Sequence, residues 1–542
     1  MSSRYIEREV IGKVSCAEGR EPTSTHCYIW IDKQFIGGKD VAQPGNVFEI
    51  VEGKDDRCFG IAEEARYIGN LTPIKEYYSF QGKATSELTH QPMNPLFVKV
   101  RVLRRSGIVA PARVAAPAVL ADSEGVKTAF ELPSEGICVG LWALPSGLPE
   151  RSDGKLFLPV YLPVEYVFGP EAAHIAVAGK TGFTKTSQML VMFRGFVTSK
   201  MFKEKTTVIL FNTKKDDLLW LDKPNPELTD KDRVLYEKMG VPPTPFPRDI
   251  ISYHKPHLKV AIPSLREEAK RFSWEWTDIK NQVYLGVDAK DWDDKLEAVL
   301  ADLADEESIT SFYGAIKELE KWLMDTKDKW APRGHHTATI RKTVRVLKGM
   351  KKRFMGIIGG NAPPLDWFTD LLDPGHIRVL DISHPFITAP ARRLIICKIA
   401  RDIQFALERR TGVTEGQKVI LVVDEFSKLA PIGATGPLRY VRDAFKDIAE
   451  RGRSMGVVLQ AIQQYISKTA PEVHDNVSTC ILMRTKPGEL SDKFYKMYSP
   501  EQKEILSRLP KGLALVEHDA FLSPFIVKFP RPPCAQKKPS KT

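Results

Sequence analysis

The pattern of hydrophobic and polar positions changes near residue 165. Before that point, short alternating or aromatic runs such as CYIWI, VFEIV, LFVKVRVL and VGLWAL are separated by turn signals such as QPGN and PSG. This spacing predicts a small β-barrel or a sandwich. After it, apolar runs alternate with amphipathic stretches, which predicts a parallel sheet covered by helices on both faces.

Apolar runs predict the strands of the α/β part, and amphipathic stretches such as residues 391–410 and 437–453 predict its helices. The runs LALVEHDAF and SPFIVKF predict a closing hairpin. The predicted strands are 175–178, 206–212, 376–383, 418–426, 456–464 and 479–485.

Composition predicts the domain boundaries. The segment PSGLPERSDG is rich in proline and glycine, so we expect it to mark the junction between a β-barrel at 1–165 and an α/β domain at 166–530. Residues 213–372 are mostly polar and helical in pattern, which predicts a helical insertion between sheet strands. Residues 531–542 are expected to form a disordered basic tail.

The stretch HIAVAGKTGFTKTSQ, residues 174–188, carries the clearest candidate chemistry. A buried strand, a glycine turn, a Lys-Thr pair and an apolar helix make the layout of a phosphate-binding loop. In such a loop, backbone N–H groups wrap the phosphates, the lysine reaches the outer phosphates, and the hydroxyl holds Mg²⁺. The predicted ATP-binding residues are Gly179, Lys180, Thr181, Gly182, Phe183, Thr184, Lys185, Thr186 and Ser187, and Thr186 is also a predicted Mg²⁺ ligand.

Thr184 departs from the pattern G-x-x-x-x-G-K-[ST], because it stands where a glycine precedes the lysine. A second register, with Lys180 and Thr181 as the Lys-Thr pair, would need a glycine at His174, and we reject it. A side chain at position 184 is expected to meet a backbone conformation that glycine adopts freely, at a cost of about 1–3 kcal/mol if the angle is left-handed. For this stretch alone, a chance turn in another α/β protein is the alternative.

Asp424 and Glu425 follow a fully apolar strand, and ligands bind at the carboxyl edge of parallel sheets. With a phosphate loop on another strand, Asp424 would hold the water shell of Mg²⁺ and Glu425 would polarise the attacking water. The alternative is an acidic pair that starts a loop or caps a helix.

The segment GRSMGVVLQAIQQ offers a polar amide, Gln463 or Gln464, at the end of the strand beside the acidic one. Arg451 and Arg453 precede it and suit a neighbouring subunit's site, as an arginine finger. Their alternative is an arginine pair at a helix C-terminus, where cations are favoured.

The net charge of +11 and the pI of about 9.1 favour an anionic partner, nucleic acid before a membrane surface. The basic stretch 341–354 and the pair Lys214-Lys215 are candidates for DNA-backbone contacts. A solvated helix face is the alternative for the stretch, and a role at the nearby nucleotide edge is the alternative for the pair. The seven dispersed cysteines contain no C-x-x-C pair, which fits a reducing cytoplasm. We find no signal peptide and no transmembrane run.

Taken in order, HIAVAGKTGFTKTS, VILFN, HIRVLDIS, VILVVDEFSKLAP, DIAERGRSMGVVLQAIQQ and NVSTCILMRT resemble the HerA family of hexameric DNA translocases, within the HerA/FtsK superfamily. The resemblance covers nearly the whole chain. It implies an α/β fold, with a small N-terminal β-barrel and a RecA-like P-loop ATPase core that carries a helical insertion. It also implies a homo-oligomeric ring, most commonly a hexamer, that uses ATP and Mg²⁺ to move double-stranded DNA.

The resemblance assigns roles by position. It implies that Lys185 and Thr186 are the phosphate and Mg²⁺ residues, Asp424 the metal-side acid, Glu425 the catalytic base, Gln464 the sensor, and Arg453 the arginine acting in trans, with Arg451 as a second candidate.

The chain departs from the family at Thr184, at Tyr465-Ile466 in place of the common Arg-Pro, and at Asn212 in place of an acidic residue. These departures concern the rate of hydrolysis, so a nucleotide-binding ring scaffold with weak hydrolysis is the main alternative. Family members work with a separate NurA-like nuclease or with antiphage effector proteins, and such a partner is expected here. A conjugation-type coupling ATPase is a third class, and it predicts membrane anchoring.

Overall fold

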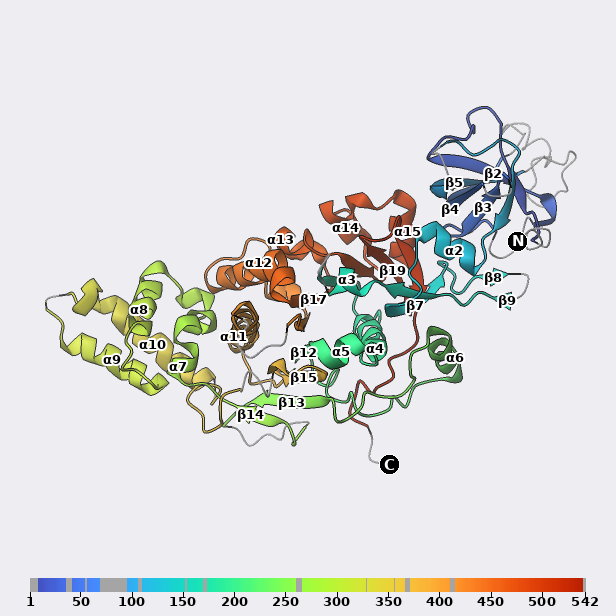
Figure 1. Cartoon of the computed structure of the whole chain (residues 1–542). Helices are drawn as coiled ribbons and strands as arrows, with labels where there is room; N and C mark the ends of the chain where they lie inside the picture. The colour runs from blue at the N-terminus through green and yellow to red at the C-terminus, as the bar shows by residue number, and fades with distance from the viewer. Residues whose placement is uncertain are drawn as a thin grey trace, which may run out of the picture. The chain divides into compact units, whose positions relative to one another are not determined.

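The computed structural model divides the chain into two compact units (Figure 1). Unit 1 comprises Met1–Leu162 and Tyr495–Phe529, and unit 2 comprises Pro163–Phe494 and Pro530–Thr542. The structure describes residues 8–35, 41–53, 56–68, 95–105, 110–151, 154–168, 173–259, 266–327, 329–354, 356–365, 371–409 and 415–539.

Unit 1 contains a closed barrel with the strand order β1-β2-β5-β4-β3-β6, which confirms the predicted barrel. Strand β2 shows why it forms, because Cys27, Ile29 and Ile31 face the core while Trp30 between them is exposed. Antiparallel pairing of β1 with β6 closes the sheet. The barrel strands are β1 (Gly12–Val14), β2 (His26–Ile31), β3 (Val47–Val51), β4 (Arg57–Tyr67), β5 (Leu96–Arg105) and β6 (Pro117–Leu120).

Four further strands of unit 1 pair antiparallel in the order β10-β7-β20-β19. The predicted hairpin is confirmed as β19 and β20, but it belongs to unit 1 and not to the α/β domain. Most of the run VGLWAL lies in β7, which is not a strand of the barrel. All seven residues of β7 are buried. The remaining elements here are α2 (Ser123–Phe130), β7 (Ile137–Ala143), β8 (Glu150–Arg151), β9 (Gly154–Lys155), β10 (Pro159–Leu162), α15 (Pro500–Arg508), β19 (Leu513–His518) and β20 (Phe525–Lys528).

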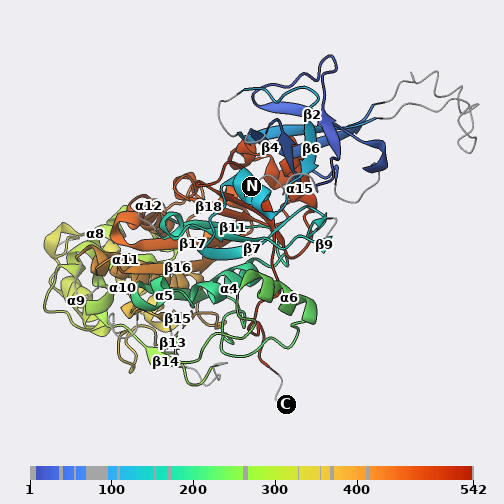
Figure 2. The same cartoon turned by 45° about the vertical axis from the view of Figure 1, so that its right-hand side comes forward.

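The strands of unit 2 follow the order β18-β11-β17-β16-β12-β15-β13-β14, and each neighbouring pair is parallel (Figure 2). The predicted parallel sheet is therefore confirmed, and each of the six predicted strands forms. Those strands are β11 (Ile175–Ala178), β12 (Thr206–Asn212), β15 (His376–Asp381), β16 (Lys418–Asp424), β17 (Val457–Gln463) and β18 (Thr479–Leu482).

The insertion at 213–372 is not purely helical, as the sequence predicted, because β13 (Ile251–Pro256) and β14 (Lys270–Phe272) extend the sheet. Its polar helices are grouped around α8 to α10 (Figure 1). The helices of unit 2 are α3 (Val164–Val167), α4 (Lys185–Phe196), α5 (Lys200–Lys205), α6 (Asp230–Met239), α7 (Trp276–Ile279), α8 (Asp294–Ala304), α9 (Phe312–Met324), α10 (Thr337–Arg353), α11 (Ala389–Glu408), α12 (Pro437–Met455), α13 (Pro471–His474) and α14 (Pro487–Leu490).

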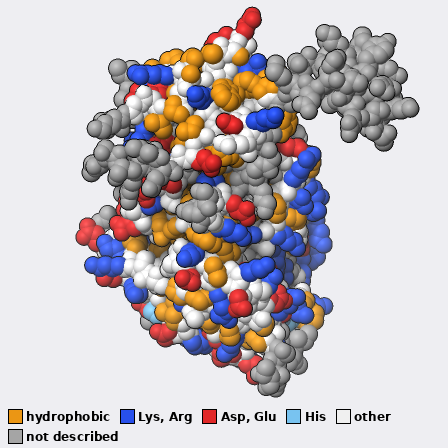
Figure 3. All heavy atoms as spheres, turned by 90° about the vertical axis from the view of Figure 1, so that its right-hand side faces the viewer, with side chains coloured by type: hydrophobic (Ala, Val, Ile, Leu, Met, Phe, Trp, Pro, Cys, Tyr) orange, Lys and Arg blue, Asp and Glu red, His pale blue; other side chains and the backbone are white. Residues whose placement is uncertain are grey.

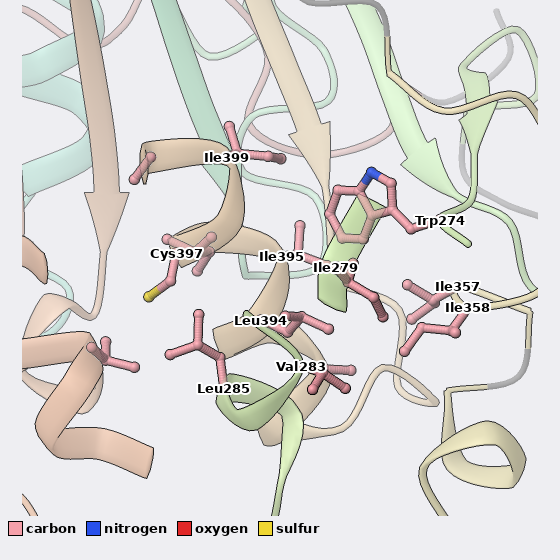
Figure 4. Packing of buried hydrophobic residues seen from close by; sticks show 14 of the residues in the cluster. Trp274, Ile279, Val283, Leu285, Ile357, Ile358, Leu394, Ile395, Cys397 and Ile399 are labelled. Atoms are coloured by element: carbon pink, nitrogen blue, oxygen red, sulfur yellow. The ribbon is translucent and has the colours of Figure 1, made fainter. Parts of the chain in front are cut away.

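Helix α11 joins the insertion to the sheet. Its buried residues Leu394 and Ile395 lie among Val283, Ile279 and Trp274 from the insertion (Figure 4). This shared core removes a large apolar area from water and holds the insertion against the rest of unit 2.

Residues 531–539 are packed and not disordered, which corrects the predicted tail. The Tyr236 hydroxyl on α6 donates to the Arg531 carbonyl at 2.7 Å, and Asn225 donates to the Pro532 carbonyl at 2.8 Å. Cys534 is completely buried. Buried residues such as Cys534 hold this segment in place, whereas the prediction of a tail was based on its lysines. Among the described residues, no helix is both long and apolar enough to span a bilayer.

Candidate functional site

Residues 179–184 connect β11 to α4 and are tied to strands on both sides. The Gly179 N–H donates to the Gln463 carbonyl at 3.3 Å, and the Lys180 N–H donates to the Arg484 carbonyl at 2.8 Å. A Cβ on Gly179, whose φ is +148°, would lie 2.8 Å from the Cβ of Met483. This position therefore requires glycine, and the loop is held between β17 and β18.

Thr184 is the N-cap of α4 and has φ 63° and ψ 25°, so the expected left-handed conformation is confirmed. Its side chain makes no capping hydrogen bond, and its buried Oγ1 has no partner among the described residues. A non-glycine residue in this region costs about 1–2 kcal/mol. The backbone strain of the loop is therefore concentrated at the residue that precedes Lys185.

Lys185 opens α4 and is 8% exposed. Its ammonium donates to the Gly179 carbonyl at 2.7 Å and to the Lys180 carbonyl at 3.3 Å, and no carboxylate pairs with it among the described residues. Burial lowers the pKa of Lys185 to about 8, although Asp424 opposes this effect. Burial disfavours the charged form of this ammonium, and a nearby anion would stabilise it.

Asp424 ends β16, and both of its carboxylate oxygens are engaged. Oδ1 accepts the Glu425 N–H at 2.7 Å, and Oδ2 pairs with the Lys214 ammonium at 2.5 Å. Glu425 has φ 57°, and its Oε2 pairs with the exposed Lys428 at 2.6 Å. Asp424 and Glu425 both influence the pKa of Lys185, so the acidic pair and the loop lysine share one electrostatic site.

Strand β17 lies between β11 and β16, so its carboxyl end lies between the loop and the acidic pair. Gln463, the last residue of β17, is buried, and its Oε1 accepts the Thr469 hydroxyl at 2.6 Å. Its Nε2 has no partner among the described residues. Gln464, the predicted sensor, follows directly and is half-buried. Both amides are at the expected edge.

The loop after β12 supplies Lys214, for which a role at the nucleotide edge was one of two expectations, and Asp217, which the sequence did not assign to the site. Lys214 pairs with Asp424, and burial raises the pKa of Asp217, which lies near both. Asn212 donates to Asp381 at 3.0 Å, so an acid lies one strand away from the departure at 212. Charged residues that follow parallel strands were the sequence feature that could have indicated these site residues. The strand order is needed to know which of them lie next to one another.

Arg484 is a second unassigned neighbour of the loop. Its guanidinium lies 5.2 Å from the centre of the Phe183 ring, on the side of β18. An arginine over an aromatic ring is a stabilising contact and places a positive charge beside the predicted phosphate loop.

The two candidate arginines of α12 differ. Arg451 pairs with Glu408 at 2.9 Å and with Asp447 at 3.3 Å, both from its own chain. Arg453 is exposed near the end of the helix. Arg451 is thus part of a surface ion-pair network within its own chain.

The basic stretch 341–354 forms most of α10, and several of its cations have partners. Lys342 pairs with Asp293 at 2.5 Å and Lys348 with Glu320 at 2.7 Å, while Arg353 pairs with Asp288. These contacts favour the alternative of a solvated, ion-paired helix face.

The residues present fit a nucleotide with Mg²⁺. Hydroxyl and carboxylate oxygens are the ligands that Mg²⁺ takes from proteins, with phosphate oxygens and water completing its shell. Thr186 in the first turn of α4 and Asp424 are such groups. Among the described residues there is no cluster of three or more His, Cys, Asp or Glu side chains that would hold a metal alone.

Fold and site together define a parallel α/β protein in which a glycine-containing strand–turn–helix loop and an acidic strand end lie at one edge of the sheet. No protein-family model and no curated protein matches the chain.

Among solved structures, the chain is similar to VirB4 of Thermoanaerobacter pseudethanolicus, with 14% identity over 73% of this chain and 96% of that chain and a TM-score of 0.44. It is similar to the bacterial conjugative coupling protein TrwB, with 12% identity over 78% and 94% and a TM-score of 0.49. It is also similar to the genome packaging NTPase B204 from Sulfolobus turreted icosahedral virus 2, with 17% identity over 30% and 70% and a TM-score of 0.22.

Proposed function

We propose that this chain is an ATPase motor with a RecA-like core that assembles as a ring, most commonly a hexamer, and moves double-stranded DNA. The observation that carries the proposal is the convergence of Lys185 and the Asp424–Glu425 pair at one sheet edge, with β17 between their strands. The order of motifs that resembles the HerA family supports the same function.

The proposed chemistry is hydrolysis by an in-line water. Lys185 would contact the outer phosphates, and Thr186 and Asp424 would hold Mg²⁺ directly or through water. Bound Mg²⁺ would neutralise charge on the phosphates. Glu425 would polarise the attacking water, since it lies next to Asp424 and shares its electrostatic environment. Gln464, or Gln463 beside it, would contact the outer phosphate or that water.

Arg453 would complete the site of a neighbouring copy, because an arginine supplied in trans stabilises the charge of the transferring phosphoryl group. Its position in the motif that resembles the HerA family and its exposure at the end of α12 support this choice. ATP would then lie between subunits, and hydrolysis would depend on assembly.

Double-stranded DNA is the proposed substrate of translocation. The net charge of +11 supports an anionic partner. Lys and Arg side chains gather along one edge of the face in Figure 3, whereas charges of both signs mix over the rest. The exposed cations of α10, such as Arg341 and Arg345, are candidates for backbone contacts. A separate NurA-like nuclease or a defence effector is the proposed protein partner, by resemblance.

A ring scaffold with weak hydrolysis is the second candidate, and the strained Thr184 favours it. Steady-state ATP turnover of the wild type and of Glu425→Ala, each with and without duplex DNA, separates the two. The motor predicts turnover well above that of the variant and stimulation by DNA. Turnover equal to that of Glu425→Ala would leave the scaffold.

A further inference from the structure

Lys214 is the cation that pairs with Asp424 in this structure, whereas Lys428 pairs with Glu425. It lies in the loop after β12, and its ammonium is 2.5 Å from Oδ2 of Asp424. The other oxygen of Asp424 accepts the Glu425 N–H at 2.7 Å. The Asp424 side chain is 11% exposed, and Lys214 occupies Oδ2, the oxygen that accepts no backbone N–H.

The surroundings of Lys214 are a mixed cluster of charges. The charges of Asp424, Asp217 and Glu425 stabilise the charged ammonium of Lys214. The charge of Lys214 in turn destabilises the charged ammonium of Lys185. Lys185 and Lys214 therefore both lie near Asp424. A divalent cation at Oδ2 would lie beside the Lys214 ammonium, and the repulsion between them is strong at such short range.

We propose that Lys214 is a counter-ion of Asp424 that competes with Mg²⁺ for this carboxylate, and that it becomes a second phosphate-binding lysine when Mg²⁺ binds. This inference rests on the proposed function. The side chain of Lys214 is 36% exposed, so its flexible stem has room to reorient. The anion within the same cluster that would receive it is the outer phosphate bound by Lys185.

The proposal distinguishes Lys214 from its neighbour. Lys215 is exposed, and its backbone carbonyl accepts the Ser383 hydroxyl at 3.4 Å. The sequence gives the two lysines equal standing, but only Lys214 contacts the acidic pair. Lys215→Met is therefore a matched control that removes the same charge one residue away.

The test measures binding of a fluorescent, non-hydrolysable ATP analogue over a series of Mg²⁺ concentrations and in EDTA. For Lys214→Met we expect the half-saturating Mg²⁺ concentration to fall, because the competing ammonium is gone, and the nucleotide affinity at saturating Mg²⁺ to weaken, because a phosphate contact is lost, each by about fivefold or more. Lys214→Arg keeps the charge and should remain near the wild type. Lys215→Met should change neither quantity.

Tighter binding of Mg²⁺ together with weaker binding of the nucleotide is the expected signature. Loss of a purely structural ion pair would instead weaken the binding of both ligands. If Lys214→Met matches the wild type, or if it raises the half-saturating Mg²⁺ concentration, the inference is wrong while the proposed function stands. If the wild type binds no nucleotide at any Mg²⁺ concentration, the proposed function fails and the inference with it. Lys214→Gln repeats the test should the methionine variant be unstable.

Discussion

At the scale of single residues, backbone strain marks the site. Six described non-glycine residues have positive φ, and two of them, Thr184 and Glu425, begin the helical turns that follow β11 and β16. Strained residues persist where the surroundings enforce them, often at functional sites. The strain at Thr184 could be predicted from the motif register. The pair of Lys214 with Asp424 could not, because it joins residues 210 positions apart.

Thr184→Gly should relieve the left-handed strain. We expect the free energy of unfolding to rise by up to about 1 kcal/mol, because the greater conformational entropy of glycine in the unfolded chain offsets part of the relieved strain. Nucleotide affinity or turnover should rise as well. Ala115→Gly is the control, because Ala115 has φ 62° and lies in unit 1. It should stabilise the fold without changing nucleotide binding. Unchanged affinity and turnover in Thr184→Gly would refute the account of this position.

Nucleotide affinity should depend on pH through Lys185. Burial lowers its pKa to about 8, and bound phosphate would raise that pKa, so binding above pH 8 requires uptake of a proton. The dissociation constant should therefore rise by up to about tenfold per pH unit above 8. Calorimetry in buffers of different ionisation enthalpy measures the proton uptake directly. An affinity that is flat from pH 7 to 9.5 would contradict this reading of Lys185.

At the scale of elements, the sequence predicted the motif strands well because fully buried parallel strands are continuous apolar runs. Strand β11 has the bounds that the sequence predicted. The edge strands β13 and β14 were missed, since their residues lie within polar sequence that resembles the helices around them. Helix α5 was also missed, because it is short and follows α4 after three residues.

Gly179→Ala and Gly182→Ala should separate a close contact from backbone freedom. Both glycines have positive φ, but only a Cβ on Gly179 would meet Met483, whereas the space around Gly182 is open. We expect Gly179→Ala to destabilise the fold by about 2–3 kcal/mol and to abolish nucleotide binding. Gly182→Ala should cost about 1–2 kcal/mol, from φ alone. Equal effects in denaturant unfolding would show that the contact with Met483 is unimportant.

At the scale of the whole molecule, the sequence predicted two domain types but placed residues 495–529 in the wrong one. Within this segment, β20 pairs with β7, which precedes it by hundreds of residues, and β19 pairs with β20. No local pattern encodes such a long-range pairing. The packed segment 531–539 was missed for a related reason, since its partners lie around α6.

A shared site predicts complementation between copies. Arg453→Ala subunits keep Lys185, and Lys185→Ala subunits keep Arg453, so each mixed interface of the right order has an intact site. Mixing the two inactive proteins should restore part of the ATP turnover, whereas Arg451→Ala should be less harmful alone. Mass measurement of the 61.0 kDa chain with nucleotide and DNA verifies assembly. Assembled mixed rings without recovered turnover would count against a site shared between subunits.

Movement along duplex DNA is the work that we propose for this site. Displacement of a triplex-forming strand from duplex DNA tests it most directly, because a motor that tracks the duplex removes the third strand as it passes. We expect ATP-dependent displacement by the wild type and none by Lys185→Ala or Glu425→Ala. ATP hydrolysis without displacement, or displacement that does not require ATP, would contradict it.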